Sequence, residues 1–394
     1  MKRLRYLALP VLLAPAVASA AFDACRADLE RKVRDAGIDS KAALEAVAAV
    51  EQRERILELD RSQPEFVQTF QAYLERRVTD DRVERGRELL GEHRELLGRV
   101  HNDFGIPPAY LIAFWGMETA FGDHFGEIPV LDSLATLACD ERRSAFFQDQ
   151  FLEAVRIIDD GNMDAAGMEG SWAGAMGHMQ FLPSTYNDHA VDYDDSGRID
   201  IWDSLPDAFG SAGRFLANSG WQAGERWGRE VRLPDDFDYR QARLDNDKPL
   251  AEWAAIGVRT ASGAPLPEAD MSGSIILPSG HEGPAFLVYD NFHVILRWNR
   301  SISYALAVGH LADRIRGMGQ LQTEWEEAPL SRDAVVRMQE RLQELGHEPG
   351  KADGVPGPGT RAALRAFQTQ QDLPADGHPD PETREALERA TADE

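Results

Sequence analysis

The sequence predicts a mainly α-helical chain of the α+β class, with a small β-containing insertion and a small helical domain at the C-terminus. Residues from about 25 to 100 are rich in helix-favouring types, and a long apolar run follows Pro107-Pro108. From Trp221 to about Gly283 the pattern changes to short alternating pieces separated by Pro, Gly and Asp, which is typical of strands and turns. A chain of 394 residues has room for two or three domains.

The N-terminus has the features of an export signal. Basic residues precede an apolar stretch from Leu7 to about Val17, and Ala18-Ser19-Ala20 supplies the small-x-small motif of a cleavage site. We therefore expect residues 1–20 to be a signal peptide, cleaved after Ala20, that delivers a soluble mature chain to the periplasm. No later segment approaches the roughly 20 apolar residues of a membrane span, so the chain is not predicted to span a membrane.

The charge of the chain limits its partners. It carries 67 acidic and 42 basic residues, which gives a formal net charge of −25. Nucleic acid is not an expected partner, because its phosphates need a surface rich in Lys and Arg. The charge favours the solubility of an exported protein and says little about affinity for a cell wall, which carries carboxylates of its own.

A single acid in an apolar run is the first candidate for catalysis. The run from Ala109 to Gly122 carries Glu118 near its end, and Pro107-Pro108 suit a helix start. Burial disfavours the charged form of a carboxylate, so Glu118 would stay protonated at a pH where an exposed Glu is ionised. Such a group can act as a general acid. The alternative is a structural Glu that pairs with an arginine such as Arg142 or Arg143.

The two cysteines, Cys25 and Cys139, indicate one disulfide. An even count in an oxidising compartment favours a bond that ties the N-terminal segment to the domain containing Glu118. Two unpaired buried thiols are the alternative. Ligation of a metal by two cysteines alone is disfavoured, because structural zinc sites use four ligands.

An acidic loop from residue 192 to residue 203 matches the spacing of an EF-hand calcium loop. Oxygen-bearing side chains stand at positions 1, 3, 5, 9 and 12, glycine stands at position 6, and position 7 offers a backbone carbonyl. Asp203 replaces the usual Glu at position 12 and reaches less far, which weakens the case for bidentate ligation. We expect a structural calcium ion here, and an acidic turn without an ion is the alternative. The predicted metal ligands are Asp192, Asp194, Ser196, Arg198, Asp200 and Asp203.

Four ordered blocks carry a resemblance to a known family. They are Trp115-Gly-Met-Glu118-Thr-Ala-Phe-Gly122, then Ser133-Leu-Ala-Thr-Leu-Ala with Arg142-Arg143, then Ser171-Trp-Ala-Gly-Ala-Met-Gly177-His-Met-Gln180-Phe181-Leu-Pro183-Ser184, and finally Asn299 with Tyr304. Together they resemble the membrane-bound lytic transglycosylase B family, which cleaves the glycan strand of peptidoglycan. The resemblance implies a lysozyme-like catalytic domain over residues 21–325, with Glu118 as the acid/base and no catalytic cofactor.

The resemblance also implies which residues contact the sugar. Ser171 would lie next to the catalytic Glu, and Gln180 and Phe181 would line the groove with a hydrogen-bonding amide and a stacking ring. Asn299 would orient the N-acetyl group. Trp298 stands where the family has a tyrosine, which keeps an aromatic surface but loses a hydroxyl. The other implied contacts are Arg142, Arg143, Tyr304 and Tyr73, and core packing is the alternative for Phe181, Tyr304 and Tyr73.

An internal repeat follows a boundary at Glu324-Trp-Glu-Glu-Ala-Pro-Leu330. Asp353-Gly-Val-Pro-Gly-Pro-Gly-Thr-Arg-Ala-Ala-Leu364 is echoed 23 residues later by Asp376-Gly-His-Pro-Asp-Pro-Glu-Thr-Arg-Glu-Ala-Leu387. The pattern resembles the small three-helix peptidoglycan-binding module of wall enzymes, which we assign to residues 329–394; a plain helical appendage is the alternative. Each Asp-Gly turn precedes a Thr able to cap the next helix. The expected core of the module is Val335, Met338, Leu342, Leu345, Leu364, Phe367 and Leu387.

One carboxyl group is enough for the expected reaction. Ordinary glycosidases use two carboxylates, ~5 Å or ~6.5–9.5 Å apart, and no second acid lies in the matching blocks. Glu118 would protonate the glycosidic oxygen and then, as a carboxylate, remove the proton from the C6 hydroxyl of the same sugar. The resemblance to the family implies that the N-acetyl carbonyl of N-acetylmuramic acid would stabilise the cationic centre. The expected product is a 1,6-anhydro ring, formed at the β-1,4 bond to N-acetylglucosamine.

Two other functions stay open at this stage. A hydrolytic muramidase of the goose-lysozyme kind would share the fold and Glu118 but release reducing ends. A non-enzymatic wall-binding protein would lack an intact cleft around Glu118. A zinc peptidase is disfavoured because His101, His124, His178 and His189 show neither His-x-His nor His-Glu-x-x-His spacing. The expected partner is the glycan strand of peptidoglycan, and the sequence names no protein partner.

Overall fold

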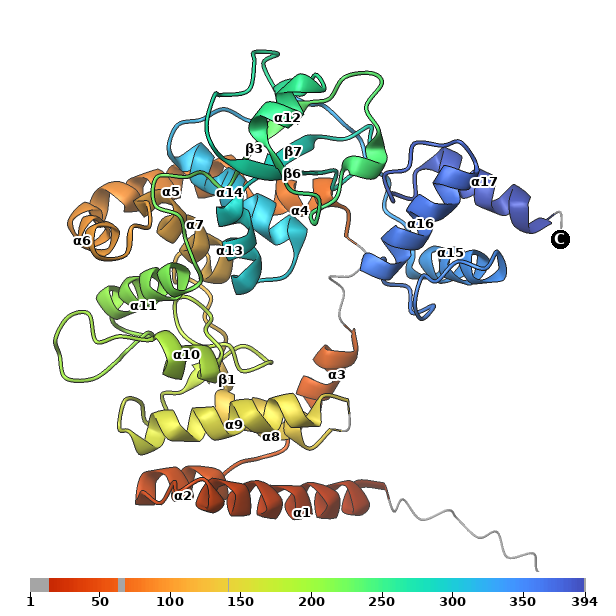
Figure 1. Cartoon of the computed structure of the whole chain (residues 1–394). Coiled ribbons are helices and arrows are strands. Elements are labelled where there is room, and N and C mark those ends of the chain that lie inside the picture. Colours follow the sequence, from red (N-terminus) through yellow and green to blue (C-terminus); the bar gives the residue numbers. More distant parts are fainter. Residues whose placement is uncertain (1–13, 63–67, 141, 393–394) are drawn as a thin grey trace, which may run out of the picture. The chain divides into compact units, whose positions relative to one another are not determined.

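The computed structural model describes the whole chain except residues 1–13, 63–67, 141 and 393–394. It divides into two compact units. One unit comprises Met1–Ser62 and Gly122–Ser211, and the other comprises Gln63–Phe121 and Ala212–Glu394. Most elements of both units are helices, as the sequence predicted (Figure 1).

The predicted signal peptide is only partly covered. Its residues 1–13 lie outside the described residues, and residues 14–20 belong to the first helix. Within the described part of the chain, no helix combines the length and the apolar character that a membrane span requires.

The first unit is built around one long helix. That helix, α9 (Ser144–Asp159), packs against α8 (Val130–Ala138), α10 (Pro183–His189) and α2 (Lys41–Ala48). Its buried side chains follow helical spacing, so one face lies against the neighbouring helices. The remaining elements are α1 (Ala14–Asp35), α3 (Glu54–Ser62), the first half of α11 (Leu205–Asn218), and the antiparallel strands β1 (Ile128–Pro129) and β2 (Glu169–Gly170).

The two cysteines form the predicted disulfide. Cys25 of α1 is bonded to Cys139, the residue that ends α8, with 5.9 Å between their Cα atoms. The bond therefore ties the N-terminal helix to the helices that follow the Glu118 segment in sequence.

The second unit surrounds one buried helix, α7 (Pro108–Thr119), with α5 (Asp80–Glu92), α6 (Arg94–Phe104) and α14 (Ile302–Ile315). The charged stretch from Glu75 to Arg99 is helical as expected, but it is divided among three helices. Helix α4 (Phe70–Arg77) ends before Thr79, whose hydroxyl caps α5 by accepting from the Arg82 N–H at 3.2 Å. A second break at His93 separates α5 from α6.

The predicted β-containing insertion is a five-stranded antiparallel sheet with the order β4-β6-β7-β3-β5. One face of the sheet belongs to a buried apolar cluster that includes Trp253 of α12 (Leu250–Ala255) together with Ile275 and Leu287. The strands are β3 (Gly228–Arg232), β4 (Lys248–Pro249), β5 (Arg259–Thr260), β6 (Ser272–Ile276) and β7 (Ala285–Val288). The sequence pattern placed Phe286 and Leu287 after the insertion, whereas the structure places them in its central strand, where they pair with both neighbours.

The C-terminal module contains α15 (Arg332–Glu344), α16 (Pro358–Gln370) and α17 (Pro381–Ala392) around the expected apolar core. The sequence repeat corresponds to a repeated hydrogen-bond network. In the first repeat, the Gln339 amide donates to the Thr360 hydroxyl at 3.0 Å and accepts from the Gly354 N–H at 2.9 Å. In the second, Gln368 does the same with Thr383 at 3.0 Å and Gly377 at 2.8 Å.

The two threonines therefore do not cap their helices as expected. Each lies inside the first turn of its helix and is buried, where its hydroxyl accepts from the glutamine of the preceding helix. Asp380 instead caps α17, because its carboxylate accepts from the Thr383 N–H at 2.8 Å.

Loss of the disulfide should destabilise the first unit. The two cysteines are 114 residues apart, and a disulfide typically contributes about 2–4 kcal/mol by constraining the unfolded chain, with more expected for a long loop. A Cys25→Ser, Cys139→Ser double variant should unfold at a lower urea concentration than the wild type, as followed by circular dichroism. Dithiothreitol should lower the wild-type midpoint to the same value and leave the double variant unchanged. An unresponsive wild-type midpoint would contradict this role.

Candidate active site

Helix α7 brings Glu118 to the end of a buried segment. Pro108 occupies its first turn, where the missing N–H costs nothing, and the helix stops where Ala120 adopts a left-handed backbone with φ 51°. Gly116 is required at that end, because a Cβ there would lie 2.6 Å from the Phe121 ring. From Ala109 to Thr119 every α7 residue except Glu118 is buried, so the carboxyl is the one partly exposed group at the C-terminal end of an apolar helix.

Two side chains hold the carboxyl of Glu118. The Tyr304 hydroxyl and the Trp298 indole N–H both donate to its Oε1 atom, the latter at 2.9 Å. Tyr304 lies in the first turn of α14, and Trp298 is the last residue of α13 (Asp290–Trp298). Among the described residues, none donates to the other oxygen, Oε2. One oxygen is therefore fixed in place while the other is left for a proton.

The surroundings of Glu118 raise its pKa to about 7. Desolvation at the end of α7 is the largest cause, because it penalises the ionised form. The hydrogen bonds from Tyr304 and Trp298, and the charge of Arg77, oppose this shift because they favour the carboxylate. Near neutral pH the group can both lose and regain a proton, as an acid/base catalyst must.

Trp298, for which we expected an aromatic surface without the hydroxyl of a tyrosine, also donates a hydrogen bond through its indole N–H. Its indole packs at 4.4 Å from the Phe114 ring and 5.0 Å from the Phe215 ring, measured between centroids. This packing fixes the indole so that its N–H points at Glu118. The indole of Trp298 is therefore a hydrogen-bond donor at the site.

Asn299 and Tyr73, two further predicted sugar contacts, differ in their exposure to solvent. Asn299 is exposed just beyond α13, where its carbonyl accepts from the Ser301 N–H at 3.0 Å and its amide nitrogen donates to none of the described residues. Tyr73 is half-buried on α4, and the Arg77 guanidinium lies 5.7 Å from its ring centre. Arg77 was missed from the sequence. Its only signal is its position one turn after Tyr73, on the same face of the helix.

Three other candidate sugar contacts lie in the first unit. The Ser171 hydroxyl accepts from the Ala175 N–H at 3.1 Å and is partly exposed. The amide nitrogen of Gln180 is already used, because it donates to the carbonyls of Phe125 at 3.1 Å and Gly177 at 3.0 Å. Phe181 is only 2% exposed. Its ring is therefore buried in this structure, and its contact with a sugar stays a prediction.

Arg142 and Arg143 pair with Asp60 in the first unit. Both guanidinium groups contact the same carboxylate oxygen, at 2.9 Å and 2.8 Å, and Asp60 is 2% exposed. The two arginines remain about half exposed, so they can still meet a ligand.

The acidic loop brings together a different set of oxygens from the predicted one. Carboxylate oxygens of Asp192, Asp194 and Asp207 lie within 4.8 Å of one another. Asp207 is fully buried, and burial together with the charges of the other two raises its pKa. Such mutual repulsion of oxygen ligands is what a hard cation relieves, so the donor set fits calcium.

The remaining predicted ligands lie outside this cluster. Asp200 is buried and pairs with Arg198 at 2.6 Å, while Asp203 is exposed. The Ser196 hydroxyl donates to the Arg198 carbonyl at 3.1 Å. Asp207 was missed because it lies in the first turn of α11, four residues beyond the twelve-residue loop.

Comparison with known proteins matches this chain to two domain families. Residues 21–313 match the transglycosylase SLT domain, and residues 331–387 match a peptidoglycan binding domain. The first match covers most of the chain and includes every residue discussed around Glu118.

This chain belongs to the SLT-domain transglycosylases.

The family assignment agrees with one curated relative and several solved structures. Membrane-bound lytic murein transglycosylase B of Escherichia coli (strain K12) is 30% identical over 249 residues, an alignment that covers 62% of this chain and 66% of that protein. SltB3 of Pseudomonas aeruginosa, in complex with NAG-anhNAM-pentapeptide, is 43% identical with a TM-score of 0.89 over 93% of this chain and 99% of that one. The Escherichia coli transglycosylase Slt35 in complex with calcium is 27% identical with a TM-score of 0.64, over 74% and 92%. The catalytic domain of this transglycosylase therefore has the lysozyme-like fold of its family.

The Tyr304 hydrogen bond should set the upper pH limit of the transglycosylase. Glu118 has a pKa of about 7 and loses its acidic proton above that value, so activity should fall on the alkaline side. Tyr304→Phe removes a hydrogen bond that favours the carboxylate, so the pKa of Glu118 should rise and the alkaline limb of kcat/KM should move to higher pH. A Tyr239→Phe variant, changed outside the site, should keep the wild-type profile. A Tyr304→Phe limb that stays in place or moves to lower pH would contradict this assignment.

Proposed function

We propose that this enzyme is a periplasmic lytic murein transglycosylase. It cleaves the β-1,4 bond between N-acetylmuramic acid and N-acetylglucosamine without water and leaves 1,6-anhydro-N-acetylmuramic acid ends. The proposal is supported most directly by one carboxyl group with a pKa of about 7, held by two donors at one oxygen only. Its relative SltB3 forms a complex with an anhydro sugar peptide, which is consistent with that product.

The first step uses the free oxygen of Glu118. In its protonated form, Glu118 donates the proton on Oε2 to the glycosidic oxygen, and the bond from C1 of N-acetylmuramic acid to that oxygen breaks. The carbonyl of the sugar's own N-acetyl group stabilises the cationic C1. Tyr304 and Trp298 stabilise the new carboxylate, because both donate to Oε1. Both hydrogen bonds are already formed before the substrate binds. The exposed amide nitrogen of Asn299 is suited to orient the N-acetyl carbonyl.

The second step closes the anhydro ring and restores the acid. The Glu118 carboxylate removes the proton from the C6 hydroxyl of the same sugar, and the C6 oxygen bonds to C1. The proton that Glu118 gave up is thereby recovered, so the two steps balance with one residue and no cofactor. A pKa near neutrality suits both steps, because neither protonation state is strongly disfavoured.

The domain boundaries and the location follow from the same proposal. We assign residues 21–325 to the catalytic domain and residues 329–394 to the peptidoglycan-binding module, with residues 1–20 as a signal peptide. Substrate in the periplasm, the Cys25–Cys139 disulfide and the small-x-small motif at Ala18 to Ala20 all support export. The glycan strand is the partner on which both domains would act.

A structural calcium ion in the first unit is a separate proposal. Asp192, Asp194 and Asp207 would hold it, and the ion would supply only charge compensation that stabilises the loop. The calcium complex of the relative Slt35 supports a site of this kind. No step of the reaction depends on this ion.

Glu118→Gln tests the reaction. The amide cannot transfer the proton, so turnover should fall by about 10²–10⁴-fold or more, while the melting temperature stays close to that of the wild type. Mass spectrometry of digested sacculi should show anhydro-muropeptides for the wild type. Mainly reducing ends would favour a hydrolytic muramidase instead. Substantial activity in Glu118→Gln would refute the assignment of the acid/base.

Two matched substitutions test the calcium ligands. Because calcium binds only the folded loop, it should raise the melting temperature of chelator-treated protein. Asp207→Asn should remove that shift if Asp192, Asp194 and Asp207 form the site, whereas Asp203→Asn should preserve it. The opposite result would restore the ligand set expected from loop spacing. If calcium does not shift the melting temperature of the wild type, the loop is an acidic turn that binds no ion.

A further inference from the structure

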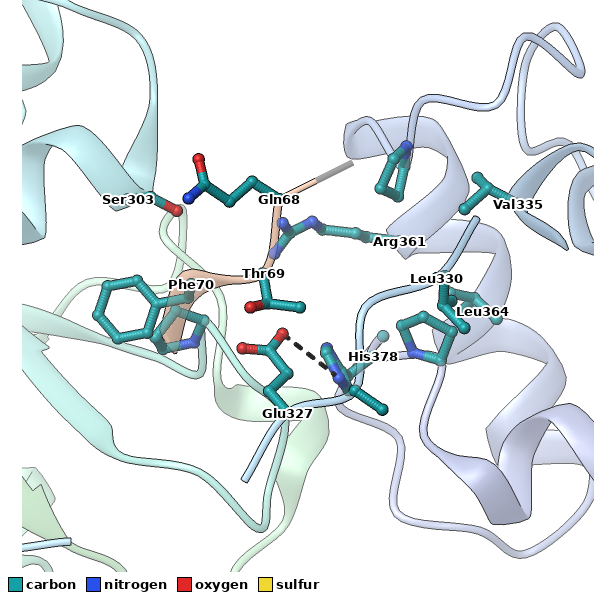
Figure 2. A pocket seen from close by; sticks show the side chains of 15 residues that line it. Gln68, Thr69, Phe70, Ser303, Glu327, Leu330, Val335, Arg361, Leu364 and His378 are labelled. Carbon is teal, nitrogen blue, oxygen red and sulfur yellow. Dashed lines mark ion pairs between the residues drawn. The ribbon is translucent and has the colours of Figure 1, made fainter. Parts of the chain in front are cut away.

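A cavity outside the proposed active site lies where the C-terminal module meets the rest of the second unit. It measures about 120 Å³, and a water molecule needs roughly 10–15 Å³ on this measure, so it can hold a small chemical group. The module contributes Arg361 and Leu364 from α16 and Leu330 from the linker, while Thr69 and Phe70 come from the start of α4. Figure 2 shows the Arg361 side chain reaching across this space toward Gln68 and Thr69.

Arg361 brings a positive charge without a partner into the cavity. Among the described residues, its guanidinium forms no hydrogen bond and no ion pair. Burial lowers its pKa, although the charges of Glu327 and Asp376 act against this effect.

Both nearby carboxylates, of which Glu327 also lines the cavity, already have hydrogen-bond partners. Glu327 accepts from the Ser279 hydroxyl at 2.9 Å and the Gln71 N–H at 3.2 Å, and His378 lies 3.9 Å away on its other side. Asp376 is buried and accepts from groups of two different domains. An anion from outside is therefore the available partner for Arg361.

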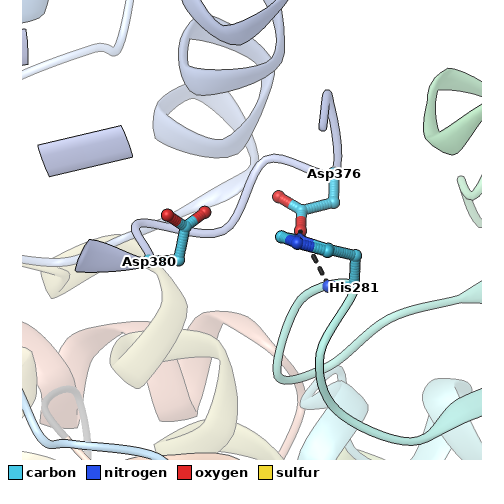
Figure 3. Close-up of side chains that lie close together, drawn as sticks. All are labelled: His281, Asp376 and Asp380. Carbon is cyan, nitrogen blue, oxygen red and sulfur yellow. Dashed lines mark hydrogen bonds and ion pairs between the residues drawn. The ribbon is translucent and has the colours of Figure 1, made fainter. Parts of the chain in front are cut away.

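Contacts between the domains hold the two walls of the cavity together. The His281 backbone N–H and its ring nitrogen Nδ1 both lie 2.8 Å from Asp376 Oδ2 (Figure 3). His281 belongs to the loop between β6 and β7, and Asp376 belongs to the second Asp-Gly turn of the module. The same carboxylate accepts at Oδ1 from the Gln368 amide of the repeated network, at 3.1 Å. The turn that organises the second repeat is thus also the turn that docks the module.

We propose that this cavity binds the carboxyl terminus of a peptidoglycan stem peptide. Arg361 pairs with the terminal carboxylate through the two-pronged geometry of a guanidinium. Leu330, Val335 and Leu364 contact the small side chain of the last residue. This inference rests on the proposed function, since only an enzyme that acts on peptidoglycan meets such stems. The site would give this transglycosylase a way to hold stem-bearing glycan at a place separate from Glu118.

The stem pentapeptide with a free C-terminus, and the same peptide with a C-terminal amide, test the site by isothermal titration calorimetry on the full chain. The free acid should bind at least about tenfold more tightly than the amide, because only the acid forms a charge-assisted pair. Arg361→Gln should weaken binding of the acid by a similar factor and remove its preference over the amide. Arg361→Lys, which keeps the charge but loses the fork, should fall between these values.

Arg389→Gln is the matched control, because it removes one positive charge from an exposed position of the same module. It should bind the free acid as the wild type does. Equal binding of acid and amide, or an Arg361→Gln variant that binds like Arg389→Gln, would overturn the proposal. So would displacement of the peptide by acetate at an equal concentration, since that would show a site for small anions rather than for a peptide end.

Activity separates this proposal from the proposed function. Arg361→Gln should digest glycan strands stripped of their stems as fast as the wild type, because Glu118 and its partners are unchanged. A loss of that activity in folded Arg361→Gln protein would contradict a stem-binding role. Failure of the Glu118→Gln experiment with intact peptide binding would instead count against the proposed reaction alone.

Discussion

The carboxyl of Glu118 at the end of an apolar helix is the constraint on which the rest of the second unit depends. Desolvation raises its pKa, and a raised pKa is useful only if the carboxylate formed during reaction is still stabilised. Tyr304 and Trp298 provide that stabilisation at one oxygen. The two effects oppose each other and leave the pKa of Glu118 near neutrality. A more solvated site would lower the pKa and leave the group ionised at neutral pH, with no proton to donate. A buried site without hydrogen-bond donors would raise the pKa further and make the group too reluctant to ionise.

The helices of the second unit hold in place the two hydrogen bonds that Tyr304 and Trp298 donate to Glu118. Helix α14 packs along α7 and carries Tyr304, and α13 ends at Trp298, whose ring is fixed by Phe114 and Phe215. The insertion is bonded to the same core through Trp227, the residue just before β3. Its backbone N–H donates to the Tyr110 hydroxyl of α7 at 3.2 Å. Its indole N–H donates to Asp313 of α14 at 3.0 Å. A sheet distant in sequence thus stabilises the two helices that carry Glu118 and Tyr304.

The module shows how a repeated sequence can acquire unequal roles. Both repeats close an Asp-Gly turn with a glutamine from the preceding helix, since the backbone N–H of the glycine and the buried threonine hydroxyl need a polar partner there. Only the second turn also bonds to His281 outside the module. The first turn, at Asp353, keeps its contacts within the module. The contact between the module and the rest of the second unit therefore distinguishes two repeats that are alike in sequence. The same contact places Arg361 beside a cavity.

The sequence alone determined the features that depend on local pattern. The apolar run with one acid, the disulfide pairing, the alternating strands of the insertion and the repeat in the module all follow from composition and spacing, and the structure confirms them. Only the tertiary structure decided which groups meet across long separations. It made Trp298 a donor to Glu118, buried Phe181, engaged the Gln180 amide and placed Asp207 with Asp192 and Asp194. Helical and strand periods specify which face is apolar, but hydrogen-bond partners far apart in sequence are fixed by packing, which no short window of residues contains.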